Sequence, residues 1–185
     1  MAQPRDVAVL VGSLRQGSFN RMTADALARL APESLRLEVV GIGELPFYNQ
    51  DLEPDPPREW RAFRDRVRAA EAVLFVTPEY NRSVPGVLKN AIDVGSRPYG
   101  ASVWDGKPGA VISVSPGAIG GFGANHHLRQ SMVFLDVPML QQPESYFGGA
   151  GKAFGEDGQP DAASEKFLRG FINAYAAWVE KILGR

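Results

Sequence analysis

The sequence predicts an α/β protein built on one small, doubly wound parallel sheet. Two observations support this fold class. Short apolar runs recur along the 185 residues, and segments with helical periodicity separate them. Strands that alternate with helices form right-handed βαβ units, which give a parallel sheet with helices on both faces. Five such strands fit an open sheet better than a barrel of eight units.

The strands are predicted from continuous apolar runs. Such runs, rich in β-branched residues, are typical of strands that are buried on both faces. Gly12 ends the first run and Pro78 ends the third. The five predicted strands lie at residues 7–11, 37–42, 72–77, 110–115 and 137–140.

The helices are predicted from apolar residues spaced three or four apart, and two of them open at proline, which is favoured at the first helical position. Residues 41–57 and 143–160 are long loops, and loops of that length are usually functional or interfacial. Residues 58–68 alternate in charge and are interpreted as a solvent-exposed helix face. The helical stripes are Phe19, Met22, Ala26 and Leu30; Trp60, Phe63 and Val67 after Pro57; Leu88, Ala91 and Ile92 after Pro85; residues 125–135; and Phe167, Phe171, Tyr175, Trp178 and Ile182.

Composition excludes several classes of chemistry. The chain has no cysteine, so disulfides, zinc–thiolate sites, iron–sulfur clusters and a cysteine nucleophile are excluded. Its only histidines are the adjacent His126 and His127, which argues against a histidine-rich metal site. A net charge of −1 gives no basic face for nucleic acid. The apolar run at 7–11 is too short for an export signal or a membrane span, so we expect a cytoplasmic protein.

The loop after the first strand has the composition of an anion site. It reads Gly12-Ser-Leu-Arg-Gln-Gly-Ser-Phe-Asn20 and leads into a helix. Free backbone N–H groups and the helix dipole favour an anion there, and Arg15 can add a charge-assisted hydrogen bond. The loop lacks both the Walker A and the Gly-x-Gly-x-x-Gly patterns. It predicts a site for a phosphate monoester, the alternative being a turn capped by Ser18 or Asn20.

Two more loops follow the third and fourth strands, and ligands of parallel sheets bind beyond these carboxyl ends. The first, Pro78-Glu-Tyr-Asn-Arg-Ser-Val-Pro-Gly86, can offer backbone groups to the edge of a flat heterocycle, with Tyr80 as a wall. The second, residues 115–123, is rich in glycine, which lets backbone approach a ligand closely. The alternative for the Pro78–Gly86 loop is an ordinary strand-to-helix turn.

A serine hydrolase is the alternative for the glycine-rich loop. Ser113-x-Ser115-x-Gly117 differs by one residue from the Gly-x-Ser-x-Gly elbow of that class. The elbow needs a histidine late in the chain, whereas His126 and His127 lie in the very next helix. The sequence therefore disfavours a hydrolase, and we expect surface or interface roles for both histidines.

Taken in order, the three loops resemble those of the NADPH-dependent FMN reductase family of flavodoxin-like proteins, particularly the bacterial quinone and chromate reductases, also called azoreductases. The likeness covers residues 7–149 and includes Leu88-Lys-Asn-Ala-Ile-Asp93, His127-Leu-Arg-Gln130 and Phe134-Leu-Asp136. It implies one flavodoxin-like, FMN-binding domain over residues 1–185, a three-layer sandwich with strand order 2-1-3-4-5. By this resemblance the FMN phosphate is held by Ser13, Arg15, Ser18, Phe19 and Asn20, the ring by Pro78, Glu79, Tyr80, Asn81 and Ser83, and the second side of the flavin by Ser115, Gly117, Gly120 and Gly121.

The resemblance also implies a ping-pong cycle. NADPH or NADH passes a hydride to N5 of bound FMN, and an acceptor then receives two electrons, so no side chain is assigned a catalytic role. Quinones, chromate, azo compounds, ferric chelates and free flavin are the candidate acceptors, and Arg82 stands where the family varies. A homodimer or homotetramer is implied, with loops around Tyr48, Tyr99 and Tyr146 as possible contacts. The alternative is a flavodoxin-type electron carrier, although such carriers tend to be strongly acidic.

Overall fold

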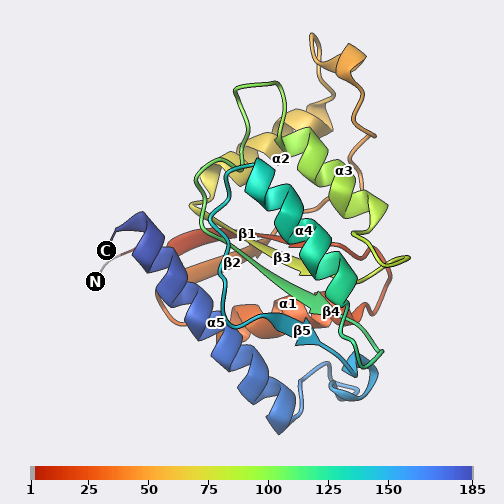
Figure 1. The fold of residues 1–185 in the computed structure, drawn as a ribbon, viewed down its shortest axis with the longest axis vertical. Coiled ribbons are helices and arrows are strands. Elements are labelled where there is room, and N and C mark those ends of the chain that lie inside the picture. Colours follow the sequence, from red (N-terminus) through yellow and green to blue (C-terminus); the bar gives the residue numbers. More distant parts are fainter. Residues whose placement is uncertain (1–2, 185) are drawn as a thin grey trace.

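The computed structural model describes residues 3–184, in which a five-stranded parallel sheet lies between two layers of helices (Figure 1). The strand order is β2-β1-β3-β4-β5, and every neighbouring pair is parallel. The predicted fold class and strand order are therefore confirmed. The strands are β1 (Arg5–Val11), β2 (Leu35–Val39), β3 (Ala72–Thr77), β4 (Gly109–Val114) and β5 (Ser145–Phe147).

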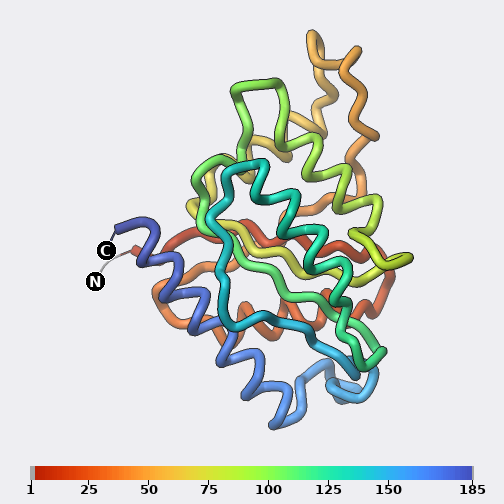
Figure 2. The backbone as a smooth tube through the Cα atoms, viewed as in Figure 1, coloured from red at the N-terminus to blue at the C-terminus, as the bar shows by residue number. Residues whose placement is uncertain are grey.

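The helices divide between the two faces of the sheet, as the tube in Figure 2 also shows. Helices α1 and α5 pack on one face, and α2, α3 and α4 pack on the other. Within residues 3–184, no helix combines the length and the apolar character needed to cross a bilayer. The helices are α1 (Phe19–Leu30), α2 (Arg58–Ala69), α3 (Gly86–Gly95), α4 (Phe122–Phe134) and α5 (Ala162–Leu183), with short 3₁₀ turns η1 (Gln50–Leu52) and η2 (Ala150–Lys152).

The central strands are buried on both faces, which explains their continuous apolar sequences. Along β1, Val7 and Val9 pack in the core beneath α1 and α5, whereas Ala8 and Leu10 pack in the core beneath α2, α3 and α4. Every residue of β3 and β4 is buried. Parallel alignment then places the carboxyl ends of β1, β3 and β4 along one edge, from which the three loops emerge.

The prediction of a fifth strand at residues 137–140 is wrong. This segment forms one isolated parallel bridge, between Met139 and Gly109 at the start of β4, in which Gly109 N–H donates to Pro138 O and Leu140 N–H donates to Gly109 O. The edge strand is instead Ser145–Phe147, which lies inside the predicted 143–160 loop. It pairs with Ile112–Val114 of β4. Pro138 has no N–H to continue a ladder. The true strand is short and partly polar, so it lacks the apolar signal that was used.

The interpretation of residues 58–68 as a solvated face is wrong at one position. Arg64 retains only 6% of its accessible surface. Its guanidinium lies over the Trp60 ring, and its Nε donates to the carbonyl of Val94 at the end of α3, at 2.9 Å. Burial lowers the pKa of the Arg64 side chain. Arg64 therefore links α2 to the carboxyl end of α3 by a hydrogen bond, at a position where the helix dipole favours a cation.

Candidate functional site

The loops after β1, β3 and β4 together line one cavity of about 360 Å³ at the carboxyl edge of the sheet. Two of its lining residues, Val114 and Pro116, were not predicted; they flank Ser115, and that adjacency is the signal that could have identified them. Five predicted residues do not line the cavity: Asn81, Ser83, Gly117, Gly120 and Gly121. The lining consists of Ser13, Arg15, Ser18, Phe19, Asn20, Pro78, Glu79, Tyr80, Val114, Ser115 and Pro116.

The first wall of the cavity is the amino end of α1. Ser18 is buried, and its hydroxyl accepts a hydrogen bond from Asn20 N–H at 3.2 Å, so it caps the helix. The Asn20 side chain is also buried, and its Oδ1 has no hydrogen-bond partner. A buried acceptor without a partner costs free energy and is rare in native proteins. This part of the wall is therefore incomplete without a donor from outside the chain.

Arg15 supplies a cation at the same end of the cavity. Its guanidinium lies 5.3 Å from the centre of the Phe19 ring, and its Nη1 donates to the backbone carbonyl of Gln16. None of the ion pairs formed within residues 3–184 involves Arg15. Its positive charge is therefore available to an anion beside the helix terminus.

The second wall is a tight turn after β3. Tyr80 and Ser83 exchange two backbone hydrogen bonds, of 3.1 and 3.0 Å. The two residues between them, Asn81 and Arg82, adopt positive φ angles of 52° and 64°. That conformation is required in a two-residue turn of this kind and is costly for a residue such as arginine. The turn holds Tyr80, half of whose surface is exposed, as a wall of the cavity.

Glu79 also belongs to this loop, but its carboxylate serves the protein. Its Oε2 accepts the backbone N–H of Ala124 in the first turn of α4, at 3.1 Å, and its Oε1 pairs with Arg82. The carboxylate is thus occupied on both oxygens. A ligand-binding role for Glu79 would have to come from its backbone.

The glycine-rich loop after β4 is shaped by packing against the sheet. Gly120 and Gly121 have φ angles of 63° and 76°. A Cβ on Gly120 would lie 2.7 Å from the backbone of Tyr146, and one on Gly121 would lie 3.0 Å from Ser113. These two glycines therefore allow the loop to lie against β4 and β5. Ser115 keeps its place in the cavity wall, where its hydroxyl accepts Gly117 N–H.

The two histidines of α4 bond to different partners. His126 Nε2 lies 2.9 Å from the Tyr146 hydroxyl, and His127 Nδ1 lies 3.0 Å from the Ser83 hydroxyl. Both side chains are exposed, as predicted for a surface role. Neither hydrogen bond reaches Ser115, so the geometry of a serine hydrolase is not formed.

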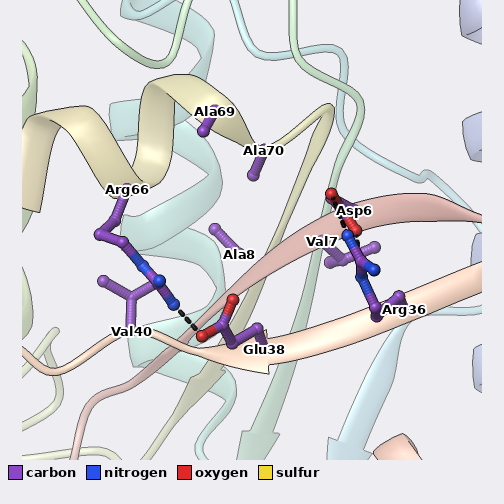
Figure 3. Close-up of a pocket in the computed structure, with 9 residues that line it drawn as sticks. All are labelled: Asp6, Val7, Ala8, Arg36, Glu38, Val40, Arg66, Ala69 and Ala70. Carbon is purple, nitrogen blue, oxygen red and sulfur yellow. Dashed lines mark hydrogen bonds and ion pairs between the residues drawn. The ribbon is translucent and has the colours of Figure 1, made fainter.

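A further hollow, of about 220 Å³, lies between β2, β1 and the carboxyl end of α2 (Figure 3). Its charged side chains neutralise one another: Arg36 pairs with Asp6, and Arg66 pairs with Glu38. It lies near the start of β1, away from the three loops. It therefore offers no unpaired group to a ligand.

Comparison with known proteins identifies the family to which this geometry belongs. Residues 5–152 match the family described as NADPH-dependent FMN reductase. The chain belongs to this FMN reductase family. The predicted enzyme class, an NAD(P)H-dependent oxidoreductase with FMN as its cofactor, is therefore confirmed at the level of the family.

Individual relatives of this FMN reductase are similar over nearly their whole length. A quinone reductase of Pseudomonas putida is 61% identical over 181 residues, which cover 97% of each chain. A 2-hydroxy-1,4-benzoquinone reductase of a Burkholderia species is 49% identical over 174 residues, 94% of this chain and 95% of the relative. Among solved structures, FerB, a flavoenzyme NAD(P)H:(acceptor) oxidoreductase from Paracoccus denitrificans, is 44% identical with a TM-score of 0.90, covering 96% of this chain and 98% of FerB.

The cavity of this FMN reductase fits the cofactor of its family. The unpaired cation of Arg15 and the amino end of α1 suit a phosphate. The unpartnered Oδ1 of Asn20 can accept a hydrogen bond from a hydroxyl group such as those of the FMN side chain. Pro78, Tyr80 and Pro116 give flat, apolar surface for a heterocyclic ring.

Proposed function

We propose that this protein is a quinone reductase that oxidises NAD(P)H and delivers two electrons to a quinone in a ping-pong cycle. The observation that carries this proposal is the cavity that the three loops share, which has the cation of Arg15 at one end and an apolar wall. The names of the two quinone-reducing relatives support the choice of acceptor class. Chromate, azo compounds, ferric chelates and free flavin are further acceptors to be tested.

The proposed FMN contacts follow from the contacts within the chain. Arg15 and the first N–H groups of α1 hold the phosphate, with Ser13, Ser18 and Phe19 completing that end and Asn20 accepting from the side chain of FMN. Bound FMN supplies the two-electron chemistry, which no side chain of this protein provides. Of the predicted ring-side and second-side residues, Pro78, Tyr80, Ser115 and the backbone of Glu79 line the cavity and are the proposed contacts. The others do not line it and are proposed to shape the loops that form it: Asn81, Ser83, Gly117, Gly120 and Gly121.

The role of the chain itself is to position the reactants. The rigid turn that holds Tyr80 and the packed loop at Gly120 and Gly121 fix the cavity walls in place. A site that holds donor and acceptor in turn against the same surface removes much of the entropic barrier to transfer. The Glu79 carboxylate accepts Ala124 N–H and pairs with Arg82, so its negative charge is partly balanced within the chain.

Steady-state kinetics test this function. Initial rates are measured with FMN-loaded protein while NADPH and 1,4-benzoquinone are varied together. Parallel double-reciprocal lines are expected, because the donor product leaves before the acceptor binds. Intersecting lines would contradict the ping-pong order, and a quinone rate no faster than that with oxygen would contradict the acceptor class.

We further propose that the protein forms a homodimer or homotetramer in the cytoplasm. Large apolar side chains that stay highly exposed support self-association: Tyr99 at 90%, Phe134 at 87% and Phe47 at 80%. Tyr48 is a weaker contact candidate, because its ring stacks on Trp60 and its hydroxyl donates to Glu53. Light scattering after gel filtration tests this state, and Phe134→Glu is expected to shift it toward the monomer.

A further inference from the structure

An apolar groove of about 390 Å³ lies along the amino-terminal half of α5, and it shares no lining residue with the flavin cavity. One wall comes from the segment before β5, and the rest of the lining comes from α5 itself. The α5 residues lie within 163–171, a stretch of about 12 Å of helix. The groove therefore follows about two helical turns. Its lining consists of Pro143, Ala163, Lys166, Phe167, Gly170 and Phe171.

Gly170 keeps this groove open. It lies in the interior of α5, where glycine is destabilising relative to alanine. A Cβ added at Gly170 would meet no atom within 4 Å, so packing does not require a glycine there. Its backbone is helical, so no special conformation requires one either. The missing side chain instead leaves space in a groove that the buried ring of Phe171 also lines.

Phe167 gives the groove an aromatic wall that is held in place. Its ring stacks on Phe147 of β5, with ring centres 5.5 Å apart and planes 14° apart. Phe147 in turn contacts the edge of the Phe154 ring. Even so, 38% of the Phe167 surface stays exposed. The groove thus offers preformed apolar surface, and preorganised surface lowers the entropic cost of binding.

Lys166 is the one charged side chain among the described residues that line the groove. It takes part in none of the ion pairs that residues 3–184 form. The acid next to it, Glu165, pairs with Arg169 at 2.7 Å. Glu144 follows Pro143 in sequence but does not line the groove. An unpaired cation beside apolar surface is complementary to a ligand with an apolar body and one negative charge.

We propose that this groove binds a medium-chain alkyl carboxylate, whose chain lies along Phe167 and Gly170 and whose carboxylate pairs with Lys166. A flexible chain can follow the surface of a helix over two turns, and burial of each methylene strengthens binding. The inference is independent of the proposed function, because the groove and the flavin cavity have no residue in common.

Calorimetry with octanoate on the FMN-loaded protein tests the charge of the ligand. Octylammonium, which has the same chain and the opposite charge, is the comparison. Octanoate is expected to bind at least about tenfold more tightly, because Lys166 attracts one head group and repels the other. Lys166→Gln should reduce that ratio to about threefold or less. The control Lys181→Gln, a cation on the same helix outside the groove, should keep it.

Two substitutions test the apolar part of the groove. Gly170→Leu should fill it and weaken octanoate binding at least about tenfold, as loss of contact with several methylenes implies. Ala177→Leu, at an exposed position of α5 outside the groove, should leave the affinity within about twofold. Thermal unfolding should show Gly170→Leu at least as stable as the wild type, so that lost binding is not lost folding.

Several results would overturn the proposal. These are no binding of octanoate, equal binding of octylammonium, or an affinity unchanged in both Lys166→Gln and Gly170→Leu. A shift toward smaller oligomers in Gly170→Leu, without octanoate binding to the wild type, would instead assign the groove to a second copy of the chain. Quinone reduction measured on the same samples keeps the two proposals apart: octanoate binding without quinone reduction would support this site and contradict the proposed function.

Discussion

The carboxylate of Glu79 accepts a hydrogen bond from the backbone N–H of Ala124, at 3.1 Å, and so joins the loop after β3 to the first turn of α4. Helix α4 has Gly121 at its N-cap, which offers no side chain for capping. The cap is supplied instead by a residue that is distant in sequence. One carboxylate therefore satisfies a helix terminus and fixes two of the three loops of the cavity relative to each other.

Removing this cap should destabilise the protein. Glu79→Ala is expected to lower the free energy of unfolding by about 1–2 kcal/mol, because a helix cap and a charge-assisted hydrogen bond are lost. Glu79→Gln retains an acceptor and should lose less. Urea unfolding measures the stability of both variants. The control is Glu165→Ala, which removes an exposed ion pair with Arg169 on α5. A Glu79→Ala protein as stable as the control would show that the bond contributes nothing.

Arg15 should matter for the phosphate of FMN in particular. Arg15→Ala is expected to weaken FMN binding about tenfold, since one charge-assisted hydrogen bond is lost. Riboflavin lacks the phosphate, so its affinity should stay within about twofold of the wild-type value. Fluorescence titration of the apoprotein with each flavin measures the two constants. Equal losses for both flavins would remove Arg15 from the phosphate site.

The backbone of the glycine-rich loop gives a matched pair of substitutions. Gly121 has a φ of 76°, and an added Cβ would lie 3.0 Å from the Ser113 side chain. Gly121→Ala is therefore expected to cost about 1–3 kcal/mol of stability. Gly117 has no such φ, and the nearest atom to its added Cβ is Ser115 Oγ, at 3.5 Å. Thermal unfolding should show Gly117→Ala close to wild type, and similar losses in both variants would refute this explanation.

The long loop after β2 should loosen in acid. Hydrogen bonds from Arg97 and then from Tyr48 lower the pKa of Glu53 below its ordinary value of 4.5. A carboxyl with a lowered folded-state pKa contributes stability above its ordinary pKa, and that contribution is lost as pH falls through the folded-state value. The wild type should exceed Glu53→Gln in urea stability at pH 7, and the gap should close below about pH 4.5. A gap that stays constant to pH 3 would contradict the assignment.

Much of the fold could be predicted from sequence, because β1, β3 and β4 are buried on both faces and therefore have continuous apolar sequences. The edge strand β5 was not predicted, because a strand paired on one side needs no such run and Ser145–Phe147 is short. For the site, the residue types of the three loops indicated a phosphate and a ring, and the five site residues predicted in the first loop do line the cavity. The direction of the Glu79 side chain and the packing of Gly120 and Gly121 depend on contacts with α4 and β5, which no local pattern records.

The central claim is that the three loops form one FMN site that passes electrons from NAD(P)H to a quinone. Its most direct test is anaerobic mixing of the FMN-loaded protein with NADPH, followed by addition of a quinone, with flavin absorbance recorded throughout. Rapid loss of the yellow absorbance and its return on adding the quinone are expected. A protein that holds FMN but stays yellow with both NADPH and NADH would contradict the enzyme and favour an electron carrier, and a protein that cannot bind FMN would contradict the site itself.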